Sequence, residues 1–283
     1  MAIDLDLLLK AYASGIFPMA DARDDPDVFW VEPKARAVIP LDNFQMSRSL
    51  RKTIRSDRFR VTADTAFADV IDICATQAAD RKETWINAEI EEAFVQLHQL
   101  GHAHSIECWQ VDETTGEDRL VGGLYGLAIG GAFCGESMFS RSRDASKVAL
   151  AWLVARLNVG GFELLDCQFM TDHLASLGAI EISQDEYVNK LRKIRGYTPS
   201  SVVSAIRSPI GSAGALVAGG AGRVAAGAGA AGAAVSGAVS FGALDALLAR
   251  LDEDLRGAVG SAESPGVSSS PGKLIAQLLT QTS

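Results

Sequence analysis

The fold is decided by HSIECWQ (104–110), LVGGLYGLAI (120–129) and AFCGESMF (132–139), three neighbouring runs that are rich in strand-forming residues. The polar loop between the first two runs predicts a hairpin. A helix is expected over 144–157, where apolar residues recur at helical spacing, and a fourth strand over 162–169. Helices interleaved with a mainly antiparallel sheet predict an α/β (α+β) fold.

The residues before this sheet predict shorter elements. A helix closed by a C-terminal glycine is expected over 4–15. Residues 17–33 are expected to form an extended loop, and 37–40 a short strand that a proline ends. Asp64 or Thr65 is expected to cap the helix that follows, because short polar side chains accept hydrogen bonds from the first turn.

The composition of the chain changes after residue 197. The chain has 283 residues and a net charge of −9, but residues 198–283 carry no net charge and are more than half Ala, Gly and Ser. We therefore expect residues 1–197 to carry the fold, followed by a low-complexity extension (198–283) with a short helix near 243–255. The small residues before that helix supply little apolar area, which favours a flexible linker over a membrane span.

Composition also limits which cellular compartment and which classes of partner are expected. The net acidity argues against general binding to nucleic acids, DNA included. The four cysteines stand singly and are expected to be reduced and buried. The acidic start of the chain has no basic or long apolar segment, which predicts a cytoplasmic protein without a membrane contact. The histidines near 98–104 have no convincing carboxylate or cysteine to complete a site, so no metal is expected.

Two acidic residues inside apolar strand-like runs are candidates for chemistry. They are Glu136 and Asp166. A buried carboxylate is costly unless it is paired or used, so each is either held by a structural arginine or backbone amides, or takes part in a reaction. Gln168 is expected on the same strand face as Asp166, two residues away. An amide beside a carboxylate could hold an amine nucleophile and accept its proton.

A basic helix is expected over 47–55. Four of its cations follow the spacing i, i+3, i+4, i+7, which collects them on one side. These cations are Arg48, Arg51, Lys52 and Arg55. Such a face is either solvated or in contact with a phosphate backbone. A second basic group, with Arg141 and Lys147, lies at the start of the helix expected at 144.

Several short blocks occur in a fixed order between about Tyr12 and Leu191. The most distinctive are GIFP (15–18), TWI (84–86), LVGGLYG (120–126), FCGESMFSR (133–141) and LDCQ (165–168). In this order they resemble the leucyl/phenylalanyl-tRNA–protein transferase family. The resemblance covers most of the chain before the extension, and several blocks in order are far more specific than any single short motif.

The resemblance implies a fold and a reaction. The fold is a small N-terminal domain (1–60) followed by a GNAT-like acyltransferase domain (61–197), which is the catalytic domain. The reaction moves Leu or Phe, and Met more weakly, from Leu-tRNA or Phe-tRNA to the α-amine of an acceptor protein with N-terminal Arg or Lys. The added residue marks that protein for degradation by the N-end rule. No metal or other cofactor is implied.

The resemblance also implies roles for individual residues. Asp166 becomes the acid/base group on the acceptor side, Gln168 orients the amine, and Glu136 positions the aminoacyl ester. Trp85 stacks on the terminal adenosine of the tRNA. Met19 stands where family members often have Trp, and makes an apolar contact without an equivalent stack. The apolar pocket for the transferred side chain is implied to involve Phe133, Gly135, Met138, Leu150 and Leu165.

Two other functions stay open at this point. An acetyl-CoA-dependent GNAT-type acyltransferase would need a glycine-rich loop that binds pyrophosphate at a helix N-terminus, and residues 140–146 lack those glycines. A non-catalytic RNA or peptide adaptor would keep the basic face but would not need Asp166 and Gln168.

Overall fold

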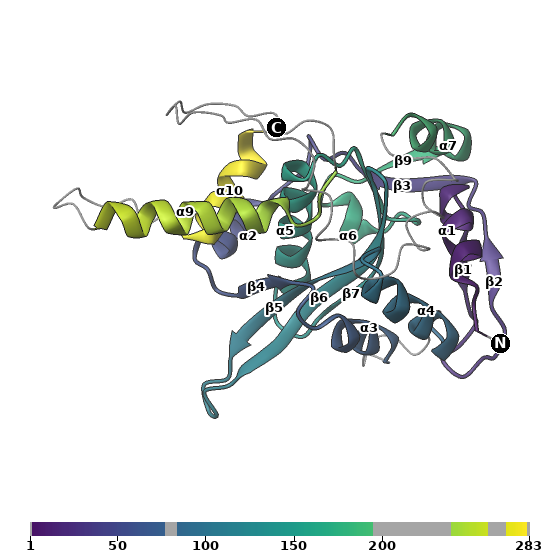
Figure 1. Ribbon diagram of the computed structural model, residues 1–283, viewed down its shortest axis with the longest axis horizontal. Coiled ribbons are helices and arrows are strands. Elements are labelled where there is room, and N and C mark those ends of the chain that lie inside the picture. The colour runs from purple at the N-terminus through teal and green to yellow at the C-terminus, as the bar shows by residue number, and fades with distance from the viewer. Residues whose placement is uncertain (1, 77–83, 195–238, 260–269, 282–283) are drawn as a thin grey trace, which may run out of the picture.

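The three runs at 104–139 form the centre of one seven-stranded mixed sheet with helices on both faces (Figure 1). The computed structural model describes residues 2–76, 84–194, 239–259 and 270–281. The flexible linker expected after residue 197 lies outside these ranges up to residue 238. The predicted α/β (α+β) class is confirmed.

The strands of the large sheet come from distant parts of the chain. They are β3 (Ala35–Ile39), β4 (Arg60–Ala63), β5 (Ala103–Val111), β6 (Asp118–Ile129), β7 (Ala132–Ser140), β8 (Leu164–Asp166) and β9 (Ile180–Ser183). Their order is β4-β5-β6-β7-β8-β3-β9; β7 and β8 run parallel and the other neighbours antiparallel. Because β3 lies between β8 and β9, the sheet does not divide at residue 60, where the N-terminal domain was expected to end.

The helices pack into two hydrophobic cores on opposite faces of the sheet. One core holds α1 (Leu5–Ala13), α3 (Phe67–Ala75), α4 (Ala88–Gln99) and α7 (Gln184–Lys193). The other holds α2 (Arg48–Arg55), α5 (Ala145–Val159), α6 (Asp172–Ala175), α9 (Ala243–Val259) and α10 (Pro271–Gln281). Adjacent residues of a strand face opposite ways, so Leu124 of β6 enters the second core and Tyr125 the first.

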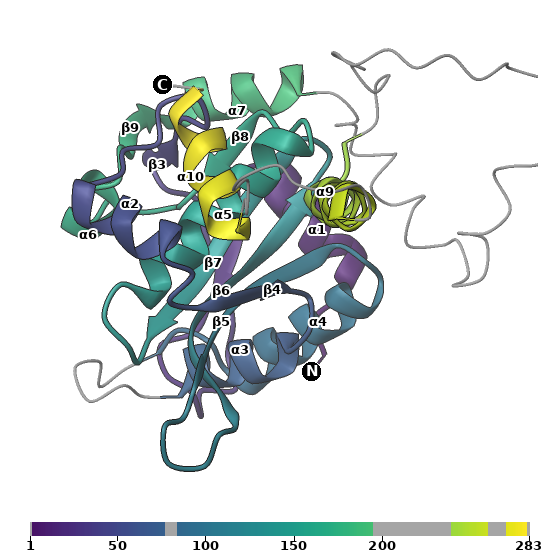
Figure 2. The ribbon, with the colours of Figure 1, turned by 90° about the vertical axis from the view of Figure 1, so that its left-hand side faces the viewer.

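Helix α5 is buried along most of its length. The sheet lies on one side of it, and α2, α9 and α10 pack on the other (Figure 2). An apolar stripe on one side would not satisfy both layers, which explains why α5 is apolar all round.

Three local expectations were wrong. Residues 17–33 are not a loop throughout, because β1 (Phe17–Met19) and β2 (Phe29–Val31) pair as a separate two-stranded sheet. Neither Asp64 nor Thr65 caps α3; its first turn instead meets the buried carboxylate of Glu107, which accepts from the Ala66 N–H (3.4 Å). The strand expected over 162–169 ends at Asp166.

The C-terminal extension contributes two helices that pack on the body. The helix expected near 243–255 is α9, and Asp245 at its start forms an ion pair with Arg156 of α5. Phe241 stacks on Phe133 of β7, with ring centroids 5.7 Å apart. α10 packs against α2 and α5.

Candidate active site

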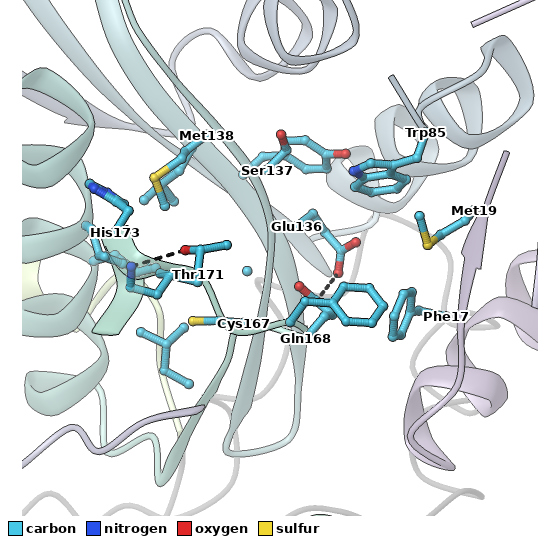
Figure 3. A pocket seen from close by; sticks show the side chains of 18 residues that line it. Phe17, Met19, Trp85, Glu136, Ser137, Met138, Cys167, Gln168, Thr171 and His173 are labelled. Carbon is cyan, nitrogen blue, oxygen red and sulfur yellow. Dashed lines mark hydrogen bonds between the residues drawn. The ribbon is translucent and has the colours of Figure 1, made fainter. Parts of the chain in front are cut away.

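A cavity of about 390 Å³ opens where β7 and β8 separate (Figure 3). These strands pair from Ala132↔Leu164 to Cys134↔Asp166. β8 ends there, whereas β7 continues to Ser140. The gap beyond the last pair is lined by residues of both cores, because no strand closes the sheet at this point.

Most of the residues predicted to bind or process substrate meet at this cavity. Those that line it are Met19, Trp85, Gly135, Glu136, Met138, Leu150, Leu165 and Gln168. They come from β1, the segment before α4, β7, α5, β8 and the turn after β8. The lining is mainly apolar, with a few polar groups gathered at Glu136 and Gln168.

Phe133 does not line the cavity, and the expectation that it would is corrected. Phe133 is fully buried at the paired end of β7, before the strands separate. Its ring packs between Phe162 and Phe241, with centroid distances of 6.4 and 5.7 Å. Phe133 is therefore a core residue that helps to hold the segment before α9.

Asp166 is fully buried and paired with Arg36 of the neighbouring strand β3. Arg36 Nε and Nη2 donate to Oδ1 (2.9 Å) and Oδ2 (2.6 Å), a bidentate geometry. The Tyr187 hydroxyl also donates to Oδ2 (3.0 Å). The structural arginine that the sequence left open is thus present, and Asp166 is not among the residues that line the cavity.

Gln168 is not on a strand face with Asp166, because β8 has already ended. Its φ of +55° lies in the left-handed region, which is uncommon for a residue other than glycine. The Gln168 N–H donates to Asp166 Oδ1 (2.9 Å). The side-chain amide Nε2 donates to Glu136 Oε1 (3.2 Å) inside the cavity. Asp166 therefore fixes the turn that directs Gln168 into the cavity.

Glu136 enters the cavity from an irregular point of β7. Gly135 pairs with Gly126 and Ser137 with Tyr125, which leaves Glu136 as the extra residue of a β-bulge. Its carboxyl group lies opposite the Gln168 amide (Figure 3). Burial raises the pKa of this carboxyl group to about 8, and the negative charge of Asp166 acts in the same direction.

One wall of the cavity is aromatic. Phe17 and Phe169 meet edge to face with centroids 5.8 Å apart, and Phe169 is 48% exposed. The Arg36 guanidinium lies 4.8 Å from the centroid of the Phe17 ring, so the buried ion pair also supports this wall. Figure 3 shows Trp85 and Met19 on the same side of the cavity. An exposed aromatic edge of this kind can take a flat ring by stacking.

Sequence reasoning missed several residues of this site. The missed lining residues include Phe17, Ser137, Cys167, Phe169, Thr171 and His173. Arg36 was missed as the partner of Asp166, although a signal was present: it is a cation inside the apolar run 35–39, the same anomaly that singled out Asp166. The lining residues gave no such signal, because aromatic and small polar residues are common in strands and turns.

The predicted phosphate-binding cations form two groups. Four cations of α2, which we call the basic face, line a surface hollow together with Ser56 and Lys273. The basic face consists of Arg48, Arg51, Lys52 and Arg55. Arg141 and Lys147 lie apart from it, at the turn from β7 into α5. Arg58, which follows α2, reaches that turn, where its Nη2 donates to Ser142 Oγ (3.4 Å).

Two further properties concern only the described part of the chain. No group of three or more His, Cys, Asp or Glu side chains is arranged there to hold a metal ion. Within the same residues, no helix has both the length and the apolar character that crossing a bilayer requires.

Comparison with known proteins identifies the family. The sequence model of the leucyl/phenylalanyl-tRNA protein transferase family matches residues 38–192, and that of its N-terminal domain matches residues 1–34. The Leucyl/phenylalanyl-tRNA--protein transferase of Rhizorhabdus wittichii is 66% identical over 187 residues, which are 66% of this chain and 73% of that relative.

Two other relatives of the same name differ in how much of the chain they cover. The protein of Novosphingobium aromaticivorans is 52% identical over 283 residues, all of this chain and 97% of that relative. The protein of Ruegeria sp. is 52% identical over 209 residues, 74% of this chain and 95% of that relative. The chain therefore belongs to the leucyl/phenylalanyl-tRNA–protein transferase family and is an aminoacyltransferase.

Proposed function

We propose that the chain transfers Leu or Phe, and Met more weakly, from aminoacyl-tRNA to the free α-amine of proteins that begin with Arg or Lys. The observation that carries this proposal is the cavity, an apolar chamber with Gln168 and Glu136 as its polar end. An apolar chamber takes an apolar side chain, and it separates similar apolar residues by only about 1–3 kcal/mol per methylene. Overlapping use of Leu, Phe and Met is the expected result.

The donor would occupy the cavity with its side chain and the aromatic wall with its terminal adenosine. Met138, Leu150 and Leu165 line the apolar end. Trp85 offers a ring face for stacking, and Met19 beside it offers an apolar contact. The basic face, Arg141 and Lys147 would meet the phosphate backbone of the same tRNA.

The reaction exchanges an ester for an amide. The acceptor amine attacks the ester carbonyl carbon, the new C–N bond forms, the C–O bond to the ribose breaks, and an amine proton is delivered to the released ribose hydroxyl. The Gln168 amide oxygen can accept from the amine while its Nε2 donates to Glu136. Glu136, which positions the ester end, is also the carboxyl group of the cavity that can exchange a proton near neutral pH.

Asp166 has a different part in this proposal from the acid/base role that the resemblance implied. Its carboxylate accepts from Arg36 twice, from Tyr187 and from the Gln168 N–H. A carboxylate with these partners, outside the cavity lining, is suited to hold Gln168 in place. We therefore assign Asp166 as a positioning residue.

The alternative functions have less support. Pyrophosphate of acetyl-CoA would need open N–H groups at the start of α5, but the Ser146 N–H donates to Ser140 Oγ (3.3 Å) and the acidic Asp144 stands at the N-cap. A non-catalytic adaptor gives no reason for a left-handed Gln168 directed into an apolar cavity.

We further infer that the added residue marks the acceptor for degradation by the N-end rule, and that the reaction takes place in the cytoplasm, where charged tRNA is found. The inference about degradation follows from the product, which is a protein with a new apolar N-terminal residue. The inference about the compartment follows from the donor, which is a charged tRNA.

A transfer assay tests the proposal. The purified chain is incubated with tRNA carrying labelled Leu, Phe or Met and with peptides that begin with Arg, Lys or Glu. Label should enter the Arg and Lys peptides, most with Leu or Phe, and should not enter the Glu peptide.

Two controls make the assay decisive. N-acetylation of the Arg peptide should abolish transfer because it removes the nucleophile. Labelled acetyl-CoA should give no transfer. Failure to transfer from any of the three tRNAs, under conditions in which one of the named relatives is active, would refute the proposal.

A further inference from the structure

The small sheet of β1 and β2 carries an exposed aromatic side chain to the edge of the cavity. Phe17 and Met19 of β1 both line the cavity, so they lie on the face of this sheet that is turned toward it. Phe29 of β2 is directly opposite Met19. Directly opposite residues of an antiparallel pair share a face, with Cβ atoms about 4.5–5.5 Å apart. Phe29 therefore extends the cavity wall beyond Met19.

Phe29 is open to solvent at this edge. It is 42% exposed and is not among the residues that line the cavity. Trp30, the next residue, is 40% exposed but lies opposite Pro18, and therefore on the other face of the sheet. A single exposed aromatic residue needs no special explanation, but Phe29 adjoins the wall of the proposed reaction site. A ligand that leaves the cavity over Met19 would meet the Phe29 ring.

The residues around β2 are acidic. Residues 20–32 contain five acidic residues and one basic residue. The exposed acidic residues are Asp21, Asp24, Asp27 and Glu32. The basic residue, Arg23, forms an ion pair with Glu91 of α4 and donates to the Ile86 carbonyl oxygen (3.3 Å), so its charge is already paired. This segment therefore presents a net negative charge beside Phe29.

An aromatic ring beside carboxylates suits a cationic ligand. An ammonium or guanidinium group is attracted to the face of an aromatic ring, and carboxylates attract it over a longer range. The same combination occurs inside the molecule, where the Arg36 guanidinium lies 4.8 Å from the centroid of the Phe17 ring and pairs with Asp166. The acidic segment repels the phosphates of tRNA, and Figure 1 shows β2 and α2, which bears the basic face, toward opposite ends of the molecule. The charge of this surface thus favours a basic peptide over the donor.

We propose that the Phe29 ring and the acidic segment 21–27 form the docking surface for the first residue of the acceptor protein. The Arg or Lys side chain of that residue lies over the Phe29 ring, and its α-amine enters the cavity past Met19, toward Glu136 and Gln168 (Figure 3). The inference rests on the proposed function, because it takes the Arg or Lys acceptor from that proposal. It adds the place where the cation is recognised.

Neutralising the acidic segment tests the charge. Asp24→Asn with Asp27→Asn removes two exposed charges, and the matched control, Glu113→Gln with Glu117→Gln, removes two exposed charges from the loop between β5 and β6. KM for an Arg peptide and KM for Leu-tRNA are measured with each chain. The Asp variant should raise KM for the peptide roughly three- to tenfold at low salt and keep turnover at saturating peptide. It should match the wild type in about 1 M NaCl, where the Debye length is about 3 Å. The control should keep both KM values.

Phe29→Ala tests the ring, and Trp30→Ala, on the opposite face of the same strand, is its control. An exposed cation–π contact is weak, so Phe29→Ala should raise KM for the Arg peptide roughly two- to fivefold, with turnover unchanged. Phe29→Tyr keeps the ring and should keep the wild-type KM, as should Trp30→Ala. If Trp30→Ala raised KM as much as Phe29→Ala, the effect would come from the small sheet as a whole, and the proposal would be overturned.

The two substrates separate the possible outcomes. A rise in KM for Leu-tRNA, with KM for the Arg peptide unchanged, would place the donor on this surface and overturn the proposal. A wild-type peptide KM in either the Asp variant or Phe29→Ala would overturn it as well, since the proposal needs both the carboxylates and the ring. A wild-type chain that transfers no Leu contradicts the proposed function, whereas an active wild type with unchanged variants contradicts this inference alone.

Discussion

At the cavity, Arg36 and Asp166 are fully buried and bonded to each other, whereas on α2 the four cations of the basic face point into solvent. The buried pair has its hydrogen bonds satisfied within the protein, so it holds strands β3 and β8 and the Gln168 turn in one geometry. The described residues that line the hollow of the basic face include no carboxylate. Its charge remains available to a polyanion.

Burial determines whether a charged side chain of this molecule contributes mainly to stability or mainly to the binding of a charged ligand. A buried ion whose partner is removed is costly, so the pair acts as a structural unit. An exposed cation contributes little to stability but acts over about a Debye length on a charged ligand. Substitutions in the two regions should therefore have effects of different kinds and sizes.

Asp166→Ala should have the largest effect. It leaves the Arg36 guanidinium buried without its carboxylate, and we expect a loss of about 3–5 kcal/mol in the free energy of unfolding, measured by urea denaturation. The exposed pair Arg60–Asp118, with side chains 54% and 41% exposed, supplies the control. Asp118→Ala should cost less than about 1 kcal/mol.

The same variant also tests how Asp166 affects turnover. Asp166→Ala should reduce turnover more than tRNA binding, because it frees the Gln168 turn and leaves the basic face intact. Replacement of both partners, Arg36→Met with Asp166→Leu, should be less destabilising than Asp166→Ala alone, since no unpaired charge remains. A double variant as unstable as the single one would mean that the pair is not a unit.

The combined change Arg51→Ala, Lys52→Ala and Arg55→Ala comes next in size. It should weaken tRNA binding and make the slope of log K against log salt shallower by about two, from roughly 0.7 per phosphate contact. Stability should hardly change, because all three side chains are exposed. Removing three exposed cations of α7 instead (Lys190, Arg192 and Lys193) should leave the slope as it is. An unchanged slope in the α2 variant would assign the basic face to solvent.

Glu136→Gln should change stability by an amount that depends on pH. The folded state raises the pKa of Glu136 from 4.5 to about 8, so between these values the folded chain keeps a proton that the unfolded chain has lost. The free energy of unfolding of the wild type should therefore fall, relative to Glu136→Gln, as the pH rises through this window. The change is at most about 1.4 kcal/mol per pH unit and stops above pH 8. Unfolding curves for both chains across the window check this, and a constant difference would contradict the raised pKa.

Local patterns were enough to predict much of this fold. Helices α4 and α2 obey short-range capping rules, since the Asn87 side chain accepts from the Ile90 N–H and the Ser47 side chain from the Leu50 N–H. Glu136 and Asp166 were found because a carboxylate inside an apolar strand is costly. What failed was the direction of individual side chains: Phe133 faces the core and Gln168 leaves the strand. A β-bulge or a residue with positive φ does not show in the hydrophobic periodicity of the sequence.

The sequence by itself determined the class of fold, the family blocks, the basic face and the two candidate carboxyl groups, because each depends on residues close together in the chain. The tertiary structure decided which groups meet. Arg36 reaches Asp166 because β3 lies beside β8, and Glu136 meets Gln168 because β7 and β8 part at a bulge. Lys273 joins α2 because an apolar helix docks across more than 200 residues of chain. Such pairings depend on strand order and packing, which local periodicity does not encode.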